Sequence, residues 1–220
     1  MGAGRSGIPG GALAKETVAS ATDPSSKAPE ERRERILRAT VDVVRTRGFA
    51  GARVSDIAEA AGTSQGLVLY HFQSLAGALN AALTLLEDEF YDDLERDLQE
   101  QAGPIERLRH MADLGAGLGP AVGDWRLWLE LWVRALHDPD ARATRESLDR
   151  RWRAALSEVV AEGVTTGDFA PIDAQASIVR LASLMDGLAI QLALEDAEVT
   201  PERLAQLWWE SAVLELRMGA

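Results

Sequence analysis

The stretch that most constrains the fold runs from Val54 to Phe72, with the sequence VSDIAEAAGTSQGLVLYHF. Its pattern predicts two short helices joined by a tight turn. Ser55 is placed to cap the first helix, expected over residues 55–61, because its hydroxyl can accept a hydrogen bond from a free amide of the first turn. Gly62 stands where a left-handed residue is needed to end that helix, and Ser64 can cap the second one. This arrangement places one helix in the major groove of DNA.

An αα-hairpin in any helical protein can show the same pattern, so the flanking sequence must decide between DNA binding and an inert hairpin. A further amphipathic helix lies upstream, from Arg32 to Val44, and Gly48-Phe49 closes it. The segment 31–85, with Gly-Phe-x-Gly-x-Arg directly before VSDIAEAAGTSQGLVLYHF, closely resembles the N-terminal DNA-binding domain of TetR-family transcriptional regulators. The resemblance implies a homodimer on a near-palindromic operator, a small-molecule effector, and repression as the usual effect.

The start of the second motif helix is where side chains can reach base edges. Gln65 can bond an adenine bidentately and Leu67 can contact a thymine methyl group, while Gly66 lets the backbone approach DNA closely. The resemblance implies phosphate contacts near the end of that helix, from Tyr70 and His71; for His71 the alternative is a partly exposed histidine with no role in binding. The expected DNA-binding residues are Arg33, Arg53, Ser55, Ser64, Gln65, Gly66, Leu67, Tyr70 and His71.

The predicted DNA-binding segment carries only a modest positive charge. Residues 32–73 hold seven arginines and four acidic residues, a net charge of +3, and the remainder carries −15, for a total of −12. A mildly basic head on an acidic body suits a protein whose head meets phosphates, although +3 also fits a solvated helix face. Where the TetR family usually has a lysine after the serine that opens the next helix, this chain has Leu75. Affinity is therefore expected to depend on Arg33, Arg53 or the N-terminal tail.

The whole chain is expected to be an all-α protein of about nine helices. Residues 1–29, rich in Gly, Ala, Ser and Pro, predict a disordered tail; residues 30–74 form the DNA-binding domain, and residues 75–220 form a helical regulatory and dimerisation domain. Apolar residues at three- and four-residue steps predict a long helix from residue 75 to about 100 that links head and body. Further helices are predicted over about 104–114, 124–136, 140–163, 178–192 and 201–216. The 124–136 helix is apolar over most of its circumference and is expected to be central.

The last two predicted helices carry more apolar surface than one body-facing stripe requires. Trp208 and Trp209 are adjacent, and so are Val213 and Leu214, so both faces of this helix should be buried. A fully internal helix would satisfy this pattern. We prefer an intersubunit four-helix bundle formed by residues of about 174–217, because helix-turn-helix proteins commonly bind DNA as two-fold pairs.

Three of the six tryptophans fall at positions i, i+3 and i+7 of the 124–136 helix, either as core residues or as one wall of a ligand cavity. With the acids Glu130 and Asp186, such a wall could hold a cation by cation–π contact; alternatively, Asp186 pairs with Arg134 in the core. Residues 124–136 and 163–192 resemble the BetI-type branch of the family, whose members sense choline-like compounds. The expected ligand-binding residues are Phe90, Met111, Trp125, Trp128, Trp132, Met185 and Asp186.

The sequence gives little support to several other classes of protein. The chain has no cysteine, which excludes disulfides, thiolate metal sites and a cysteine nucleophile. No run of about 18 apolar residues and no apolar leader are present, so a cytoplasmic protein without membrane, metal or cofactor is expected. An all-α enzyme would need a catalytic motif, and none is recognisable. An interaction module that has lost DNA binding stays open, because Leu75 and the acidic total favour it.

Overall fold

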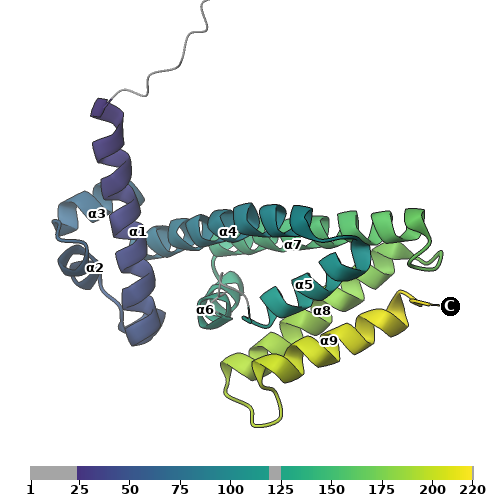
Figure 1. Ribbon diagram of the computed structural model, residues 1–220. Helices are drawn as coiled ribbons and strands as arrows, with labels where there is room; N and C mark the ends of the chain where they lie inside the picture. Colours follow the sequence, from purple (N-terminus) through teal and green to yellow (C-terminus); the bar gives the residue numbers. More distant parts are fainter. Residues whose placement is uncertain (1–23, 119–124, 220) are drawn as a thin grey trace, which may run out of the picture.

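The computed structural model describes residues 24–118 and 125–219, and within these ranges it consists of nine helices and no strands (Figure 1). The predicted all-α fold is confirmed. The first three helices form a head, the fourth leads away from it, and the remaining five complete the body (Figure 1). The helices are α1 (Pro24–Gly51), α2 (Val54–Ala60), α3 (Gln65–Phe72), α4 (Leu75–Glu100), α5 (Pro104–Gly115), α6 (Trp125–Ala135), α7 (Pro139–Thr166), α8 (Ala174–Ala193) and α9 (Pro201–Glu215).

Helix α1 begins eight residues before Arg32, its predicted start. Pro24 is the first helical residue, where a missing amide hydrogen breaks no helical hydrogen bond. Pro29, the predicted end of the tail, lies inside the helix, where it removes one backbone hydrogen bond. Gly48, with φ 66°, interrupts α1 where the sequence predicted its end. The disorder predicted for residues 1–23 concerns a part of the chain outside the described residues.

The N-terminus of α2 differs from the prediction. Arg53 occupies the cap position, and its amide donates a hydrogen bond of 3.0 Å to the carboxylate of Asp56. Ser55 lies inside the first turn, so the prediction that it caps the helix was wrong. The physical reason is that an acidic side chain at the third helical position can reach back to the amide of the cap residue.

The turn and the start of α3 are as predicted. Gly62 has φ 59°, the left-handed conformation that ends α2. The Ser64 hydroxyl accepts a hydrogen bond of 3.2 Å from the amide of Leu67, which caps α3. Val68 is completely buried, and Ala58 of α2 is nearly so, as the close crossing of the two helices requires.

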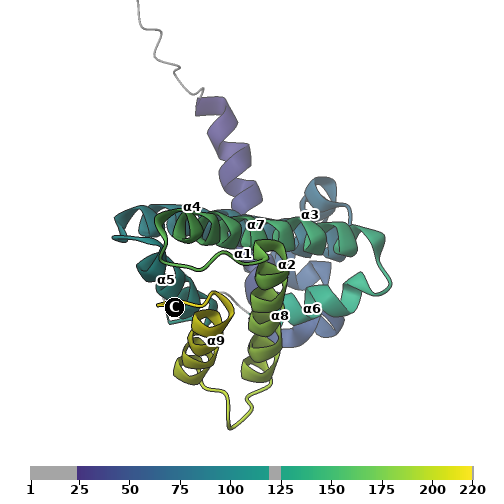
Figure 2. The ribbon, with the colours of Figure 1, turned by 90° about the vertical axis from the view of Figure 1, so that its right-hand side faces the viewer.

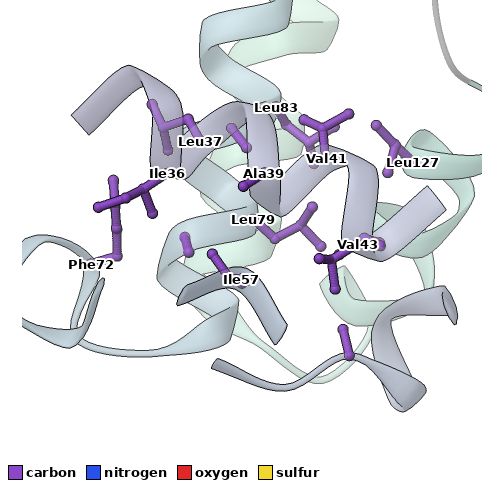
Figure 3. Packing of buried hydrophobic residues seen from close by; sticks show 14 of the residues in the cluster. Ile36, Leu37, Ala39, Val41, Val43, Ile57, Phe72, Leu79, Leu83 and Leu127 are labelled. Carbon is purple, nitrogen blue, oxygen red and sulfur yellow. The ribbon is translucent and has the colours of Figure 1, made fainter. Parts of the chain in front are cut away.

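The core of the head continues into the body. Ile36 and Val41 of α1 belong to the same buried cluster as Leu79 of α4 and Leu127 of α6 (Figure 3). Apolar contact of this kind is the main stabilising interaction of a folded chain. The core that holds the head together therefore extends past residue 74 into α4 and α6.

Helices α8 and α9 lie side by side (Figure 2) and form part of a second core. Trp208 of α9 is completely buried, and its indole N–H donates a hydrogen bond of 2.8 Å to the carbonyl oxygen of Leu181 in α8. Leu214, six residues further along α9, is 78% exposed. Helix α9 is thus not fully internal within one protomer.

Helix α6 is not the central helix that its composition predicted. Leu127, Leu131 and Ala135 are buried, but Val133 is 62% exposed and Leu136, just after the helix, is 67% exposed. The helix packs against α1, α7 and α8, and the side that carries Val133 meets solvent. The tryptophans account for the discrepancy, because large amphipathic rings can be half-buried at the edge of a core.

Helix α8 is the one helix within the described residues that is long and apolar enough, by length and composition alone, to cross a membrane. A core helix of a soluble protein meets the same criterion. Seven of its residues are buried among other helices here, including Leu181 and Met185.

Candidate functional site

The first candidate site is the exposed face of α3. Ser64, Gln65 and Gly66 are exposed at its N-terminus, and Tyr70 is 80% exposed near its C-terminus. Leu67 and His71 are half-buried beside them. Apart from an edge-on contact with the ring of His71, the Tyr70 ring meets solvent, so it is available for contact with another molecule.

The other residues predicted to bind DNA lie around α3 in different environments. Arg53 is exposed before α2, whereas Ser55 is half-buried in its first turn. The guanidinium of Arg33 in α1 lies 5.3 Å from the ring centre of Phe72, so it is held near the end of α3 by a cation–π contact. Leu75 packs against the core of the head, which explains why an apolar residue occupies this position.

The junction between α3 and α4 is tightly built. The hydroxyl of Ser74 accepts a hydrogen bond of 2.9 Å from the amide of Gly77, and Gln73 is in the left-handed region at φ 63°. A Cβ atom on Gly77 would lie 2.2 Å from the carbonyl oxygen of Phe72. This close backbone approach fixes the direction in which α3 meets α4.

The second candidate site is a cavity of about 310 Å³ in the body, with walls from α4, α6, α7 and α8 and the end of α5. Five of the seven predicted ligand-binding residues line it, namely Phe90, Trp125, Trp128, Met185 and Asp186. Met111 does not, because it is completely buried in the body core. Trp132 does not either, because it lies one turn further along α6 than Trp128.

Seven polar or aromatic residues of the cavity were missed from the sequence. All of them lie within one residue of an apolar position of α4 or α7, and this proximity is the only sequence signal that could have identified them. The signal is weak, because apolar periodicity shows which face of a helix is buried but not which face borders a cavity. The missed residues are Glu87, Glu89, Tyr91, Asp93, Asp149, Trp152 and Arg153.

The lining of the cavity is rich in acidic side chains. It comprises five carboxylates and one basic residue, Arg153. Burial raises the pKa of Glu87 to about 7, although the indole N–H of Trp128 donates a hydrogen bond of 3.1 Å to it and opposes the shift. Burial likewise raises the pKa of Asp186 to about 6 and that of the Tyr91 hydroxyl above its usual range. Aromatic rings beside such carboxylates suit a cation.

Two other expectations about charged residues were wrong. Glu130 does not border the cavity; its carboxylate accepts a hydrogen bond of 3.0 Å from the backbone amide of Phe49 in the head. Arg134 bonds Asp138 at 3.2 Å and lies 4.6 Å from the ring centre of Phe49, so it is not the partner of Asp186. Both residues contact the head because α6 packs directly against α1.

Helix α6 therefore lies between the cavity and the head. Trp128 and Glu130 are two residues apart, which is about 200° around a helix, so they point in nearly opposite directions. Trp128 faces the cavity, and the carboxylate of Glu130 accepts a hydrogen bond from the backbone amide of Phe49, at the turn that follows Gly48. A movement of α6 that follows occupancy of the cavity would be transmitted to this turn.

The third candidate site is the outer side of α8 and α9. Val179 of α8 is 45% exposed, and Leu214 of α9 is 78% exposed. Trp209 is half-buried, with the guanidinium of Arg109 at 4.5 Å from its ring centre. Apolar side chains on neighbouring helices are available here for contact with a second protein surface.

Comparison with known proteins gives a consistent result. The family described as "Bacterial regulatory proteins, tetR family" matches residues 36–82, and the one described as "BetI-type transcriptional repressor, C-terminal" matches residues 104–212. The chain is 32% identical over 123 residues to the "HTH-type transcriptional regulator BetI" of Stenotrophomonas maltophilia, an alignment that spans 54% of this chain and 62% of that protein. It is 28% identical to the regulator of the same name from Ectopseudomonas mendocina, over 84% of this chain and 93% of that protein.

Solved structures that are similar to this chain also belong to transcriptional regulators. A putative transcriptional regulator from Saccharomonospora viridis, in complex with choline, is similar with a TM-score of 0.77 and 27% identity, over 86% of this chain and 98% of that chain. A putative TetR-family transcriptional regulator from Rhodococcus sp. is similar with a TM-score of 0.73 and 25% identity, over 85% of this chain and 99% of that chain.

Proposed function

The chain belongs to the tetR family of bacterial regulatory proteins, and from this premise we propose that it is a cytoplasmic repressor released from its operator by a quaternary ammonium compound. The observation that carries the proposal is the combination of an exposed α3 surface with a cavity walled by tryptophans and carboxylates. The exposed surface of α3 is suited to binding DNA, and the cavity is suited to binding an organic cation.

A homodimer through α8 and α9 would account for the apolar side chains on their outer side, including Val179 and Leu214. Two-fold symmetry then places two α3 helices on one duplex. Their half-sites are expected about 34 Å apart, one helical turn of DNA, or a multiple of this distance. A palindromic operator follows from this symmetry.

The chemistry of the cavity and the choline-bound relative together favour a quaternary ammonium effector. Rings of Trp125 and Trp128 offer cation–π contact, and Glu87 and Asp186 offer negative charge. A volume of about 310 Å³ is at the small end of ligand cavities, which fits a small organic cation.

Release requires that the effector bind better to a conformer that does not fit the operator. We propose that this conformer differs in the position of α6. The hydrogen bond between Glu130 and the amide of Phe49, and the packing of Arg134 on the ring of Phe49, would carry the displacement to the head.

The proposed function is tested by selecting bound sequences from a random duplex pool at about 150 mM salt, which screens weak phosphate attraction. A recovered palindrome that choline then releases is the expected result. Absence of enrichment with folded, dimeric protein would contradict a DNA-binding role. Enrichment without release by any organic cation would contradict the assigned effector class alone.

Replacing Tyr70 with alanine is expected to weaken operator binding by about tenfold or more, because a hydrogen bond from its hydroxyl to a phosphate would be lost. The Tyr70→Phe variant, which keeps the ring, should lose most of the same affinity. Fluorescence anisotropy with the selected operator measures both. The thermal stability of the dimer should not change, since Tyr70 is 80% exposed. Operator affinity equal to that of the wild type would rule out the contact.

Replacing Glu130 with alanine is expected to raise the choline concentration needed for operator release by about tenfold, because one hydrogen bond that ties α6 to the head is removed. Direct binding of choline should stay unchanged, since Glu130 does not line the cavity. Glu146→Ala, at an exposed position of α7, is the control. Release at the wild-type concentration would show that the signal takes another route.

A further inference from the structure

Helix α6 carries an apolar stripe on a side that faces solvent in the protomer. Leu129, Val133 and Leu136 follow one another at four- and three-residue steps, so they lie on one side of the helix. Val133 is 62% exposed and Leu136 is 67% exposed, whereas Leu131, about 200° around the helix from Val133, is completely buried. A helix that met only solvent on this side would be expected to carry polar residues there.

The stripe forms one wall of an open groove. Leu129 and Val133 line the groove from α6, and Ala193 and Leu194 line it from the C-terminal end of α8. Leu194 is 69% exposed, so both walls present apolar side chains to solvent. Of the eight large apolar side chains that are exposed within the described residues, three lie in this groove or next to it. Such a cluster indicates an interaction surface, whereas single exposed apolar residues do not.

The groove is continuous with the outer side of α8 and α9, which is the proposed dimer face. Val179 and Leu194 are 15 residues apart in sequence, which on a helix is about 22 Å along the axis and a net rotation of about 60°. They therefore lie on the same side of α8. Leu214 lies near Val179, because Ser177 donates a hydrogen bond of 2.6 Å to Glu215. The exposed apolar positions thus extend from Leu214 along α8 to the groove.

The size of a stable dimer interface also favours a contribution from the groove. Such an interface buries about 800 Å² on each partner and involves about 20 to 30 residues. Within the described residues, α8 and α9 themselves hold two exposed large apolar side chains, Val179 and Leu214. Val133, Leu136 and Leu194 at the groove add the apolar surface that an interface of this size requires.

We propose that a second copy of this chain covers the groove between α6 and the end of α8, so that α6 belongs to the dimer interface. The inference rests on the proposed function, which assigns a homodimer to α8 and α9. It adds to that interface the helix in which Trp128 lines the cavity and Glu130 bonds the amide of Phe49. A displacement of α6 in one protomer then changes the surface that its partner contacts, so the two cavities are coupled and effector release is cooperative.

The test uses single cysteines, because the chain has none of its own and one introduced thiol therefore reports on one position. In Val133→Cys, the thiol should react with a maleimide-linked polyethylene glycol at least about 10-fold more slowly than in Glu146→Cys, because an interface excludes the reagent. Glu146 is exposed on α7 and serves as the control. Each rate is divided by that of the same variant unfolded in urea, which removes differences in thiol reactivity. Leu214→Cys, in the proposed dimer face of α8 and α9, should also be protected.

The outcomes separate the inference from the dimer itself. Fast labelling of Val133→Cys in protein that sediments as a dimer and is protected at Leu214→Cys would overturn the role of the groove and leave the proposed dimer intact. A monomer that labels rapidly at both positions would contradict the dimer, and with it this inference. Protection of Val133→Cys that is lost when residues 1–23 are deleted from a chain that stays dimeric would show that the chain's own N-terminal residues cover the groove, and would also overturn the inference.

Discussion

Replacing Glu87 with glutamine is expected to lower the affinity for choline by about 10- to 100-fold at pH 8. The variant removes the carboxylate that faces the cavity beside Trp128, and interactions with a charged group contribute more than neutral ones. The glutamine oxygen can still accept the indole hydrogen bond of Trp128, so the wall should keep its geometry. Glu89→Gln is the matched control, because Glu89 pairs with Arg38 at the rim of the cavity and is 43% exposed.

The same variant should alter the pH dependence of binding. With its pKa raised to about 7, Glu87 is mostly protonated at pH 6 and mostly ionised at pH 8, so the affinity of the wild type for a cation should rise over this range. The pKa of Asp186, raised to about 6, contributes a smaller rise at the lower end. Titrations between pH 5.5 and 8.5 measure this directly. A profile of equal steepness in Glu87→Gln would show that another group controls binding.

The free energy of unfolding should fall with rising pH, whereas the affinity for a cation rises. A pKa raised on folding means that the folded state holds the proton of Glu87 more tightly, so stability is greatest below the unfolded value of 4.5 and falls as pH rises through about 7. Glu87→Gln removes this loss and should raise the free energy of unfolding at pH 8 by up to about 3 kcal/mol. Urea denaturation at pH 5 and pH 8 checks the sign.

Replacing Gly77 with alanine is expected to destabilise the protein by about 3 kcal/mol and to abolish specific operator binding. The added Cβ atom would lie 2.2 Å from the carbonyl oxygen of Phe72, a backbone atom that cannot rotate away. Either α3 shifts relative to α4 or the cap formed by Ser74 is lost. Urea denaturation and operator binding measure the two consequences.

Gly66→Ala is the matched control for the effect of this substitution on stability. A Cβ atom there meets nothing closer than 3.9 Å, and the residue lies in the same head. Its stability should equal or slightly exceed that of the wild type, since alanine is the better helix former. If Gly77→Ala unfolded no more easily than Gly66→Ala, the junction would be more adaptable than its geometry implies.

Local sequence signals predicted much of the fold. Ser64 and Ser74 cap the helices that follow them, and Gly62 adopts its left-handed turn, because these features depend on a few neighbouring residues. The cap at Ser55 failed for an equally local reason, namely that Asp56 reaches the amide of Arg53. The start of α1 at Pro24 could not be predicted from the composition of residues 1–29.

The candidate sites depended more on tertiary packing. The exposed side chains of α3 could be predicted because the helix-turn-helix pattern determines which face of α3 packs on α2 and which face meets solvent. In the body, periodicity found Trp125 and Trp128 but could not separate them from Trp132, since all three lie on one helix within seven residues. Glu130 was assigned to the ligand and instead bonds Phe49, a residue 81 positions away in sequence that only the folded chain brings near.

The buried cluster that joins α1, α4 and α6 limits how a protein of this kind can acquire a new operator. Because Leu79 and Leu127 complete the core around Ile36, the head is not a module that can be exchanged at residue 74 without reshaping its contact with α6. New DNA specificity should therefore arise by substitutions on the exposed face of α3, such as Gln65. Recombination between paralogues should succeed only where the head and α6 are inherited together.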